Sequence, residues 1–205
     1  GQGGFDTATV TITVIPVNDA PVAEPDTAET EEDTALAIAV LANDSDVDGD
    51  ELEIESVTAP TNGTASIEGT AIFYTPNADF NGTDSFTYEV SDGQGGTDTA
   101  IVTVTVTPVN DPPQLAPIDD ATVAEGELVQ IDVEAGDPDA ADELTFELSE
   151  APASAEIDPR TGVIQWTAAD GPAEVSFTVR VTDTGSPELS DTETFTITVA
   201  NVAPA

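Results

Sequence analysis

Acidic side chains in this chain gather in short groups that recur along the sequence. Asp and Glu number 42, against two cations, Arg160 and Arg180, and the sequence has no Lys, His or Cys. Calcium takes roughly six to eight oxygen ligands at about 2.3–2.6 Å, so it needs several carboxylate, amide or backbone oxygens held together against their repulsion. A recurring acidic group is therefore a candidate calcium site, whereas a single exposed acid is ordinary solvated surface.

Four such groups return with one period. They are a linker pair, an acid before the first apolar strand, a doublet after that strand, and an acid that ends the penultimate strand. In sequence order these are Asn18–Asp19 and Asn110–Asp111, Glu32 and Glu125, Asp46/Asp48 and Asp137/Asp139, and Asp92 and Asp183.

An internal repeat sets this period. Residues 1–19 recur at 93–111, a shift of 92 residues with four differences. We therefore expect residues 1–19 to be the last strand and linker of a truncated upstream repeat, 20–111 a first module with its linker, and 112–205 a second module. Proline keeps both linkers extended and stiff.

Strand patterning argues against disorder, which strong acidity with few aromatic residues could otherwise indicate. Apolar residues alternate with Thr over 8–15, 100–107 and 193–199, as in strands with one face on a core. Short strands between Gly-containing turns indicate an all-β sandwich, with Trp166, Phe73, Tyr74, Phe86 and Tyr88 in the core. The expected strands are 35–41, 52–57, 64–67, 71–74, 85–90 and 100–106, then 128–133, 144–148, 163–166, 175–181 and 192–199.

With these groups in order, the chain resembles the cadherin family, in particular the bacterial cadherin-like and Ig-like tandem repeats of large surface adhesins. The stretch ETEEDT with VLANDSDVDGDEL resembles the bacterial Ig-like type, and IDPRTGVIQWTAADG resembles the dystroglycan-type cadherin-like module. The resemblance implies Greek-key β-sandwich modules in an extended rod, with Ca²⁺ at the junctions. It assigns Glu32, Asn110, Asp111, Asp137, Asp139 and Asp183 to one junction, and Asn18, Asp19, Asp46, Asp48 and Asp92 to the upstream one.

The sequence departs from the family in places. Where the family has Asp-Arg-Glu, the second module offers Asp158 with Arg160 at the Glu position, and the first offers only Glu68. The final linker, which begins at Asn201, lacks its Asp. We therefore expect fewer ions per junction than in a full cadherin, and a poor site at the C-terminal end.

One motif points elsewhere. Asp44, Asp46, Asp48 and Gly49, followed by Glu55, satisfy the EF-hand loop pattern. An EF-hand needs flanking helices, yet the residues around Glu55 alternate as in a strand. An EF-hand, a local loop-bound calcium and a contribution to the junction are the three alternatives.

Function is bounded by what the chain lacks. Most nucleophile–base pairs use His, Cys or Lys, so we expect no enzyme, with a glycosidase-like carboxylate pair as the one catalytic option. A net charge of −40 excludes nucleic acid as a partner. We expect a calcium-stiffened spacer, extracellular or at the cell surface, whose partners are calcium ions and neighbouring repeats. The alternatives are a calcium-dependent module that binds polysaccharide or like repeats on another cell, and acidity that is a general high-salt adaptation.

Overall fold

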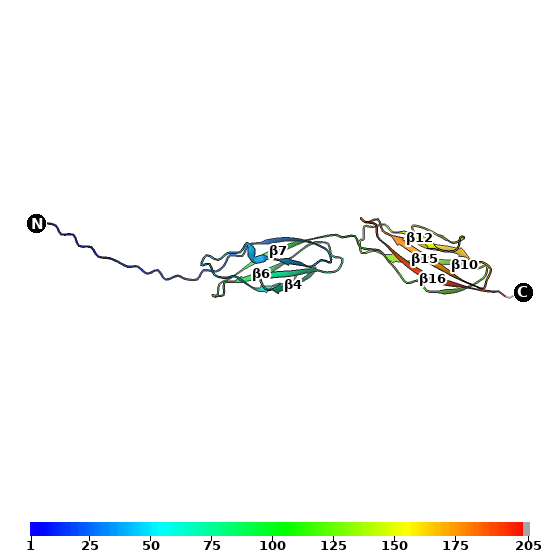
Figure 1. Ribbon diagram of the computed structural model, residues 1–205, viewed down its shortest axis with the longest axis horizontal. Helices are drawn as coiled ribbons and strands as arrows, with labels where there is room; N and C mark the ends of the chain where they lie inside the picture. Colours follow the sequence, from blue (N-terminus) through cyan, green and yellow to red (C-terminus); the bar gives the residue numbers. More distant parts are fainter. Residues whose placement is uncertain (203–205) are drawn as a thin grey trace. The chain divides into compact units, whose positions relative to one another are not determined.

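The computed structural model describes residues 1–202 and contains two compact units, Gly1–Pro108 and Val109–Ala205 (Figure 1). We call the sandwich of the first unit module 1 and that of the second module 2. The boundary between the modules predicted from the sequence lies after Asp111, whereas the structure divides the chain after Pro108. Among the described residues, no helix is long and apolar enough to cross a membrane.

Module 1 consists of two sheets packed face to face. One has the order β1-β7-β6-β3 and the other β2-β5-β4, with β1 parallel to β7 and the other pairs antiparallel. The elements are β1 (Asp26–Glu31), β2 (Leu36–Ile38), the 3-10 turn η1 (Val40–Ala42), β3 (Glu53–Val57), β4 (Gly63–Glu68), β5 (Ala71–Pro76), β6 (Gly82–Ser91) and β7 (Thr97–Thr107).

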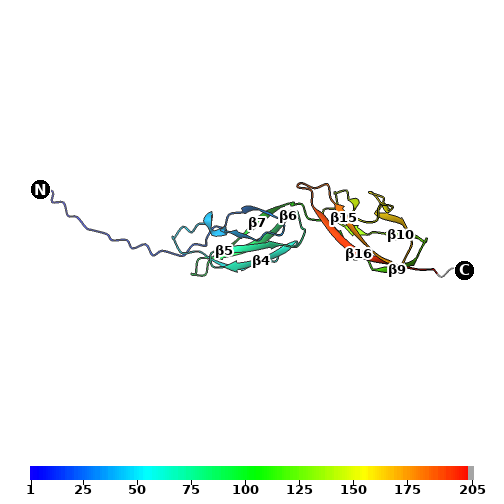
Figure 2. The same cartoon turned by 45° about the vertical axis from the view of Figure 1, so that its right-hand side comes forward.

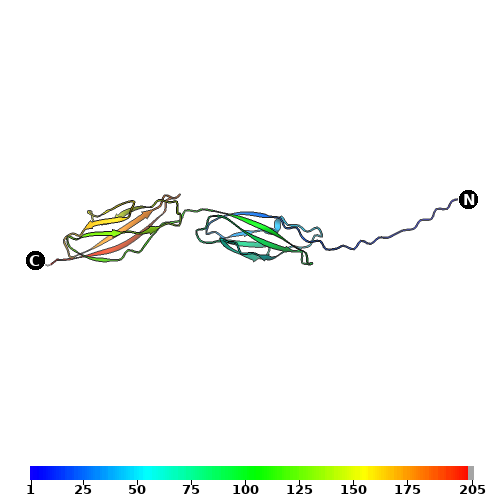
Figure 3. The same cartoon turned by 180° about the vertical axis from the view of Figure 1, so that it is seen from behind.

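Module 2 repeats this plan. One sheet has the order β12-β15-β16-β9, with β9 parallel to β16, and the facing strands form β10-β14-β13 and the short pair β11-β8. The strands are β8 (Gln114–Leu115), β9 (Ala121–Ala124), β10 (Leu128–Asp132), β11 (Ala135–Gly136), β12 (Thr145–Glu150), β13 (Glu156–Ile157), β14 (Val163–Thr167), β15 (Ala173–Thr182) and β16 (Ser190–Ala200). The all-β sandwich prediction is confirmed, and Figures 2 and 3 show the layers of each module from two further sides.

Alternation along the strands builds both cores. In module 1, Tyr74 stacks on Phe86 with ring centroids 6.1 Å apart. In module 2, Trp166 meets Phe177 edge-on at 5.3 Å, and both are buried, as predicted for Trp166. The prediction of Phe73 as a core residue is wrong, because it points outward between the inward-facing Ile72 and Tyr74 and is 36% exposed.

Residues 1–19 lie in no strand, although residues 97–107, the counterpart of residues 5–15 in the repeat, form β7. Strand backbone needs neighbouring strands for its N–H and C=O groups. Here β7 has β1 and β6, whereas residues 1–19 have no paired neighbour within the described residues.

Candidate metal sites at the start of each module

Asp183 directly follows β15, at the end of module 2 where the linker enters, and is only 3% exposed. Its carboxylate accepts hydrogen bonds from the backbone N–H groups of Leu189 (2.8 Å) and Gly185 (3.1 Å) and from the linker amide Asn110 Nδ2 (3.0 Å). The Asn110 amide also donates to the Pro187 carbonyl at 3.0 Å. The linker is thereby fixed to the β15–β16 loop of its own module.

Three more carboxylates lie beside Asp183. Asp137 follows β11, and its Oδ1 accepts the Asp139 N–H at 2.9 Å, while Asp139 Oδ2 accepts the Asp111 N–H at 2.8 Å. One oxygen each from Asp137, Asp142 and Asp183 lies within 4.8 Å of the other two. The second oxygen of Asp137 is buried and has no hydrogen-bond donor. We call Asp137, Asp139, Asp142 and Asp183 start cluster 2.

Burial and crowded negative charge both act on the pKa values of start cluster 2. Desolvation raises the pKa of Asp137, as do the charges of Asp139, Asp183 and Asp142, while the Asp139 N–H acts in the opposite direction. Desolvation also acts on Asp183, but its donors from Leu189, Asn110 and Gly185 outweigh it and lower its pKa. The cluster therefore combines a carboxylate that is held ionised with one whose charge the protein disfavours.

Module 1 builds the same arrangement from its own residues. Asn18 Nδ2 donates to Asp92 Oδ2 at 2.7 Å, and this bond, more than any other influence, lowers the pKa of Asp92. The Asp19 N–H donates to Asp48 Oδ2 at 2.8 Å. We call Asp46, Asp48, Asp50 and Asp92 start cluster 1.

Start cluster 1 also has a carboxylate oxygen without a donor. The Asp48 N–H donates to Asp46 Oδ1 at 2.7 Å, while Asp46 Oδ2 is buried with no hydrogen-bond partner. Desolvation and the charges of Asp46, Asp48 and Asp92 raise the pKa of Asp50. The two modules thus place an unsatisfied buried oxygen at the same point of the repeat.

Glycines permit the linker to approach these carboxylates. A Cβ at Gly185 would overlap the Asn110 side-chain amide. A Cβ at Gly96 would overlap the Asp92 carboxylate and lie 2.8 Å from the Ala20 Cα. A side chain at either glycine would therefore separate the Asn–Asp pair that fixes the linker.

Comparison with known families and structures identifies the modules. Residues 18–105 match the family described as Bacterial Ig domain, and residues 112–200 match the family described as "Putative Ig domain". Both modules are Ig-type repeats. Among curated proteins, none matches the sequence of this chain.

Solved cadherin structures share the fold of these Ig-type repeats. The chain resembles human CDH23 repeats EC21-23 (22% identity, TM-score 0.59, covering 89% of this chain and 70% of that one). It resembles Drosophila N-cadherin EC1-4 (19%, 0.59, covering 90% and half of that chain) and human mucin-like protocadherin EC1-2 (20%, 0.53, covering 89% and 98%). The predicted resemblance to bacterial cadherin-like and Ig-like repeats is confirmed.

The buried glutamate Glu32 directly follows β1 and lies away from start cluster 1. Glu32 is 3% exposed, and its N–H donates to the Thr107 carbonyl at the end of β7, whereas Asp92 and Gly96 precede the start of that strand. Its carboxylate accepts Asn81 Nδ2 at 3.3 Å. Glu32 therefore does not join Asn18, Asp46, Asp48 and Asp92 within the Ig-type repeat, and its assignment to a junction remains a prediction.

Glu125 has the corresponding place in module 2. Its N–H donates to the Ala200 carbonyl at the end of β16, and its two carboxylate oxygens accept the N–H groups of Gly171 (3.3 Å) and Val202 (3.2 Å). This acid is satisfied by backbone donors of its own repeat.

The residues offered for the Asp-Arg-Glu motif lie elsewhere in the fold. Asp158 accepts the N–H groups of Arg160 and Thr161, both at 2.9 Å, in the turn before β14, whereas Glu125 contacts the loop after β14. Glu68 ends β4 in the β4–β5 hairpin, whereas the loop beside Glu32 is β5–β6. The proposed correspondence of Asp158 and Glu68 is thus not supported, because each residue stands at the opposite end of a strand from the glutamate concerned.

Four acids that lie beside the predicted site residues were not predicted from the sequence. Asp50 and Asp142 belong to the start clusters, and a signal existed, since each is followed by Glu-Leu at the same place in the repeat. Asp33 and Asp79 lie near Glu32, with the Asp79 N–H donating to Asp33 Oδ1 at 3.3 Å. Both have positive φ, 57° and 56°, which no periodic pattern announces.

The EF-hand reading does not fit the fold. Asp44 accepts the Tyr88 hydroxyl at 2.9 and 3.0 Å and the Glu24 N–H at 2.8 Å. Glu55, the last position of the pattern, lies in strand β3. The segment lacks the exiting helix that an EF-hand requires.

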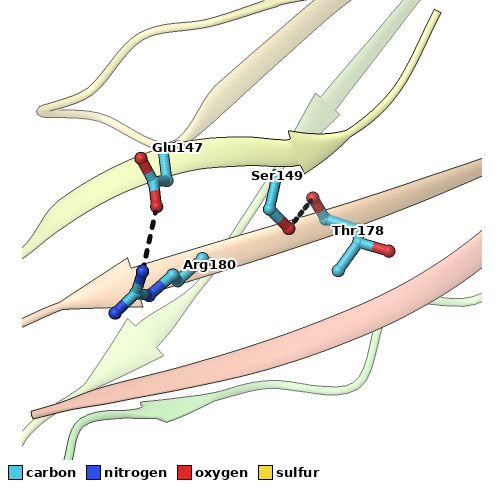
Figure 4. Close-up of polar contacts among 4 residues, drawn as sticks. All are labelled: Glu147, Ser149, Thr178 and Arg180. Carbon is cyan, nitrogen blue, oxygen red and sulfur yellow. Dashed lines mark hydrogen bonds and ion pairs between the residues drawn. The ribbon is translucent and has the colours of Figure 1, made fainter.

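Both cations of the chain have acidic neighbours outside the start clusters. Arg180 Nη1 lies 3.5 Å from Glu147 Oε1 on the exposed face of β12 and β15, next to the Ser149 hydroxyl that donates to the Thr178 carbonyl (Figure 4). Arg160 lies beside Asp158. The backbone N–H groups of Thr161 and Arg160 lower the pKa of Asp158 most, and the Arg160 charge lowers it a little further.

Proposed function

We propose that each start cluster binds Ca²⁺ and that the chain is a calcium-stiffened spacer in a surface adhesin or secreted multidomain protein. The observation that carries this proposal is the buried second oxygen of Asp46 and of Asp137, which has no hydrogen-bond donor in either module. A buried, ionised oxygen without a donor is costly unless a cation supplies the missing contact.

The chemistry of the donor set favours calcium. Start cluster 2 offers four carboxylates, and the linker adds the side-chain oxygens of Asn110 and Asp111. All of these ligands are oxygen atoms, and several are charged. The set supplies enough of them for the roughly six to eight oxygen ligands that Ca²⁺ takes. Thiolate and imidazole are absent from the chain, which disfavours zinc and copper.

Stiffening follows from the position of the linker residues. Asn18 and Asp19 contact start cluster 1, and Asn110 and Asp111 contact start cluster 2. An ion in either cluster would hold the linker against the module that follows it. Glu32 is the predicted further ligand from module 1. Extracellular calcium-binding modules commonly have dissociation constants of about 10⁻⁴–10⁻³ M, so sites of this kind suit a location outside the cell.

The test combines binding with stability. We expect calorimetry to show calcium binding that is lost stepwise in Asp46→Asn and Asp137→Asn variants. At a hundredfold excess over the dissociation constant, each site adds about 2.7 kcal/mol, so the melting temperature rises by about 10 °C or more. Scattering from the whole chain should report a narrower distribution of dimensions in calcium than in chelator.

Sodium and magnesium at matched ionic strength are the controls. Equal stabilisation by sodium and calcium would favour general high-salt adaptation over specific sites. No stabilisation by calcium, together with unchanged scattering, would contradict the proposal.

A further inference from the structure

The second residue of the last strand is an aspartate in both modules, and it occupies a core-facing position. Asp98 in β7 pairs with Val90, and Asp191 in β16 pairs with Val181. Residues that pair directly share one face of a sheet, and both valines are fully buried. Acids are rare at such positions unless the fold supplies hydrogen-bond donors to the carboxylate.

Each of these carboxylates has the same two backbone donors. Its Oδ1 accepts the N–H of the following threonine, at 2.8 Å in module 1 and 2.7 Å in module 2. The Ala23 N–H donates to Asp98 Oδ2 at 2.9 Å. The Leu115 N–H donates to Asp191 Oδ2 at the same distance. The Ala23 N–H, followed by that of the threonine, lowers the pKa of Asp98, so this carboxylate is held ionised.

The donors Ala23 and Leu115 end two short segments that begin in the linkers. Residues 19–23 and 111–115 each run from the linker aspartate to the residue whose N–H is held. We call these segments the struts. The central residue of each strut is a proline, Pro21 or Pro113, and both prolines are buried. Because proline fixes φ and burial holds its ring in place, a displacement at one end of a strut reaches the other end.

The other end of each strut contacts a start cluster. The Asp19 N–H donates to Asp48 Oδ2 at 2.8 Å. The Asp111 N–H donates to Asp139 Oδ2, also at 2.8 Å. Each strut is therefore held at one end by a carboxylate of the start cluster and at the opposite end by the aspartate of the last strand, which belongs to neither cluster.

We propose that Asp98 and Asp191 are positioning residues for calcium, which hold the struts so that the linker oxygens face the start clusters before an ion binds. This inference rests on the proposed calcium sites. A ligand that is already fixed in place loses less conformational freedom on binding, so the ion binds more tightly. In the first strut the Val22 N–H also donates to the Ser45 carbonyl at 2.8 Å, so losing the aspartate should weaken calcium binding without abolishing it.

The first test is calcium calorimetry on the full chain carrying Asp191→Ala. We expect the affinity at module 2 to fall roughly 10-fold, as for other groups that orient metal ligands, while module 1 is unchanged. Asp191→Asn keeps one acceptor oxygen for two N–H groups, so its loss should be smaller. Asp120→Ala is the matched control, because Asp120 Oδ1 accepts the Thr196 N–H at 2.6 Å further along β16. This control should bind calcium normally.

A double-mutant cycle separates positioning from a general loosening of module 2. Asp111→Ala removes the carboxylate that the strut carries, so adding Asp191→Ala should then cost little further affinity. Loosening of the module would lower the affinity equally in both backgrounds, and that result would overturn the proposal. Should the tryptophan signal show that Asp191→Ala does not fold, Asp191→Asn takes its place in the cycle.

A measurement in chelator tests the hold on the strut without any ion. We expect the Leu115 amide to exchange its hydrogen faster in Asp191→Ala than in the wild type, because its acceptor is gone. Equal calcium affinity in the wild type and in Asp191→Ala would overturn the positioning role and leave the calcium sites standing. Absence of calcium binding by the wild type would overturn both.

Discussion

Start cluster 2 and Glu125 place acids at the two ends of one module, but only start cluster 2 has a buried carboxylate oxygen without a donor. Glu125 has a backbone N–H for each carboxylate oxygen, from Gly171 and Val202. Start cluster 2 brings four carboxylates together and leaves one oxygen of Asp137 without any donor. The number of acids is therefore a poor guide to a metal site. A donor-less oxygen inside a group of several acids is a better one, since Asp26 also has a buried oxygen without a donor but belongs to no start cluster.

Asp84 supports the same conclusion in module 1. It is 4% exposed, more buried than most acids of the chain, yet it accepts the Tyr74 hydroxyl and the N–H groups of Thr61, Asn62 and Ser85. Its charge is stabilised by the fold alone. Burial without unsatisfied oxygens indicates a structural role.

The largest expected effect follows from removing Asp183. Asp183→Ala deletes a ligand and the acceptor that fixes Asn110, so we expect calcium affinity at module 2 to fall by at least on the order of 100-fold, since even outer-sphere partners of a metal site contribute 10–100-fold. Calorimetry measures it, with Glu125→Gln as the matched control. A similar loss in Glu125→Gln would remove the distinction between the two ends of the module.

Gly185→Ala should have the next largest effect. The added Cβ overlaps the Asn110 amide and displaces the linker while every ligand side chain remains. We expect roughly a 10-fold loss of calcium affinity, within the range for disturbing groups that orient ligands. Gly136→Ala, beside Asp137 with open space at its Cβ, should bind calcium normally.

The effect of Asp137→Asn on the melting temperature of module 2 should change sign when calcium is added. In chelator, the raised pKa of Asp137 means that its ionised form is disfavoured in the folded state, so the neutral amide should raise the melting temperature of module 2 by a few degrees. In calcium the same variant should melt lower than the wild type, because it loses a charged ligand. Thermal unfolding followed by tryptophan measures both, and destabilisation under both conditions would argue against charge crowding.

Acidification in chelator sharpens this comparison. Because the pKa of Asp137 is raised in the folded state, protonation as pH falls through that value relieves its repulsion, and the advantage of Asp137→Asn should disappear. The pKa of Asp183 is shifted in the opposite direction. Its lowered pKa contributes stability above the unfolded-state value, and that contribution is lost as pH falls through the folded-state value, so Asp183→Asn should be destabilising at neutral pH.

The smallest effect is expected at the surface pair of Figure 4. Arg180 and Glu147 have side chains 44% and 57% exposed. Arg180→Gln should reduce the unfolding free energy of module 2 by about 0.2–1 kcal/mol at low salt and by less at high salt. Calcium binding should be unchanged, since this pair lies outside the start clusters.

Much of the fold was predictable because half-buried strands reveal themselves by alternation. β6, β7, β15 and β16 carry long apolar faces and were all anticipated. β1 was not, because its sequence DTAETE is polar and only Thr30 is buried, so its pairing with β7 depends on tertiary context. The short β8, β9, β11 and β13 were missed because two to four residues are too few to show an alternating pattern.

The start clusters were partly predictable. Repetition selected Asp46, Asp92, Asp137 and Asp183, and the structure gives them equivalent partners in the two modules. The correspondence of Asp158 failed because a short motif carries no information on which end of a strand it occupies. Unsatisfied oxygens were also invisible in sequence, since they depend on which N–H groups the loops present.

The parallel pairing of the last strand of each module with an early one, β7 with β1 and β16 with β9, has a mechanical consequence. Tension applied through the two linkers would pull β1 and β7 in opposite directions along their length, so that their ladder is sheared and its bonds share the load instead of breaking one at a time. β1 and β7 align six residue pairs, whereas β9 and β16 align four. Under force, module 1 should therefore yield after module 2.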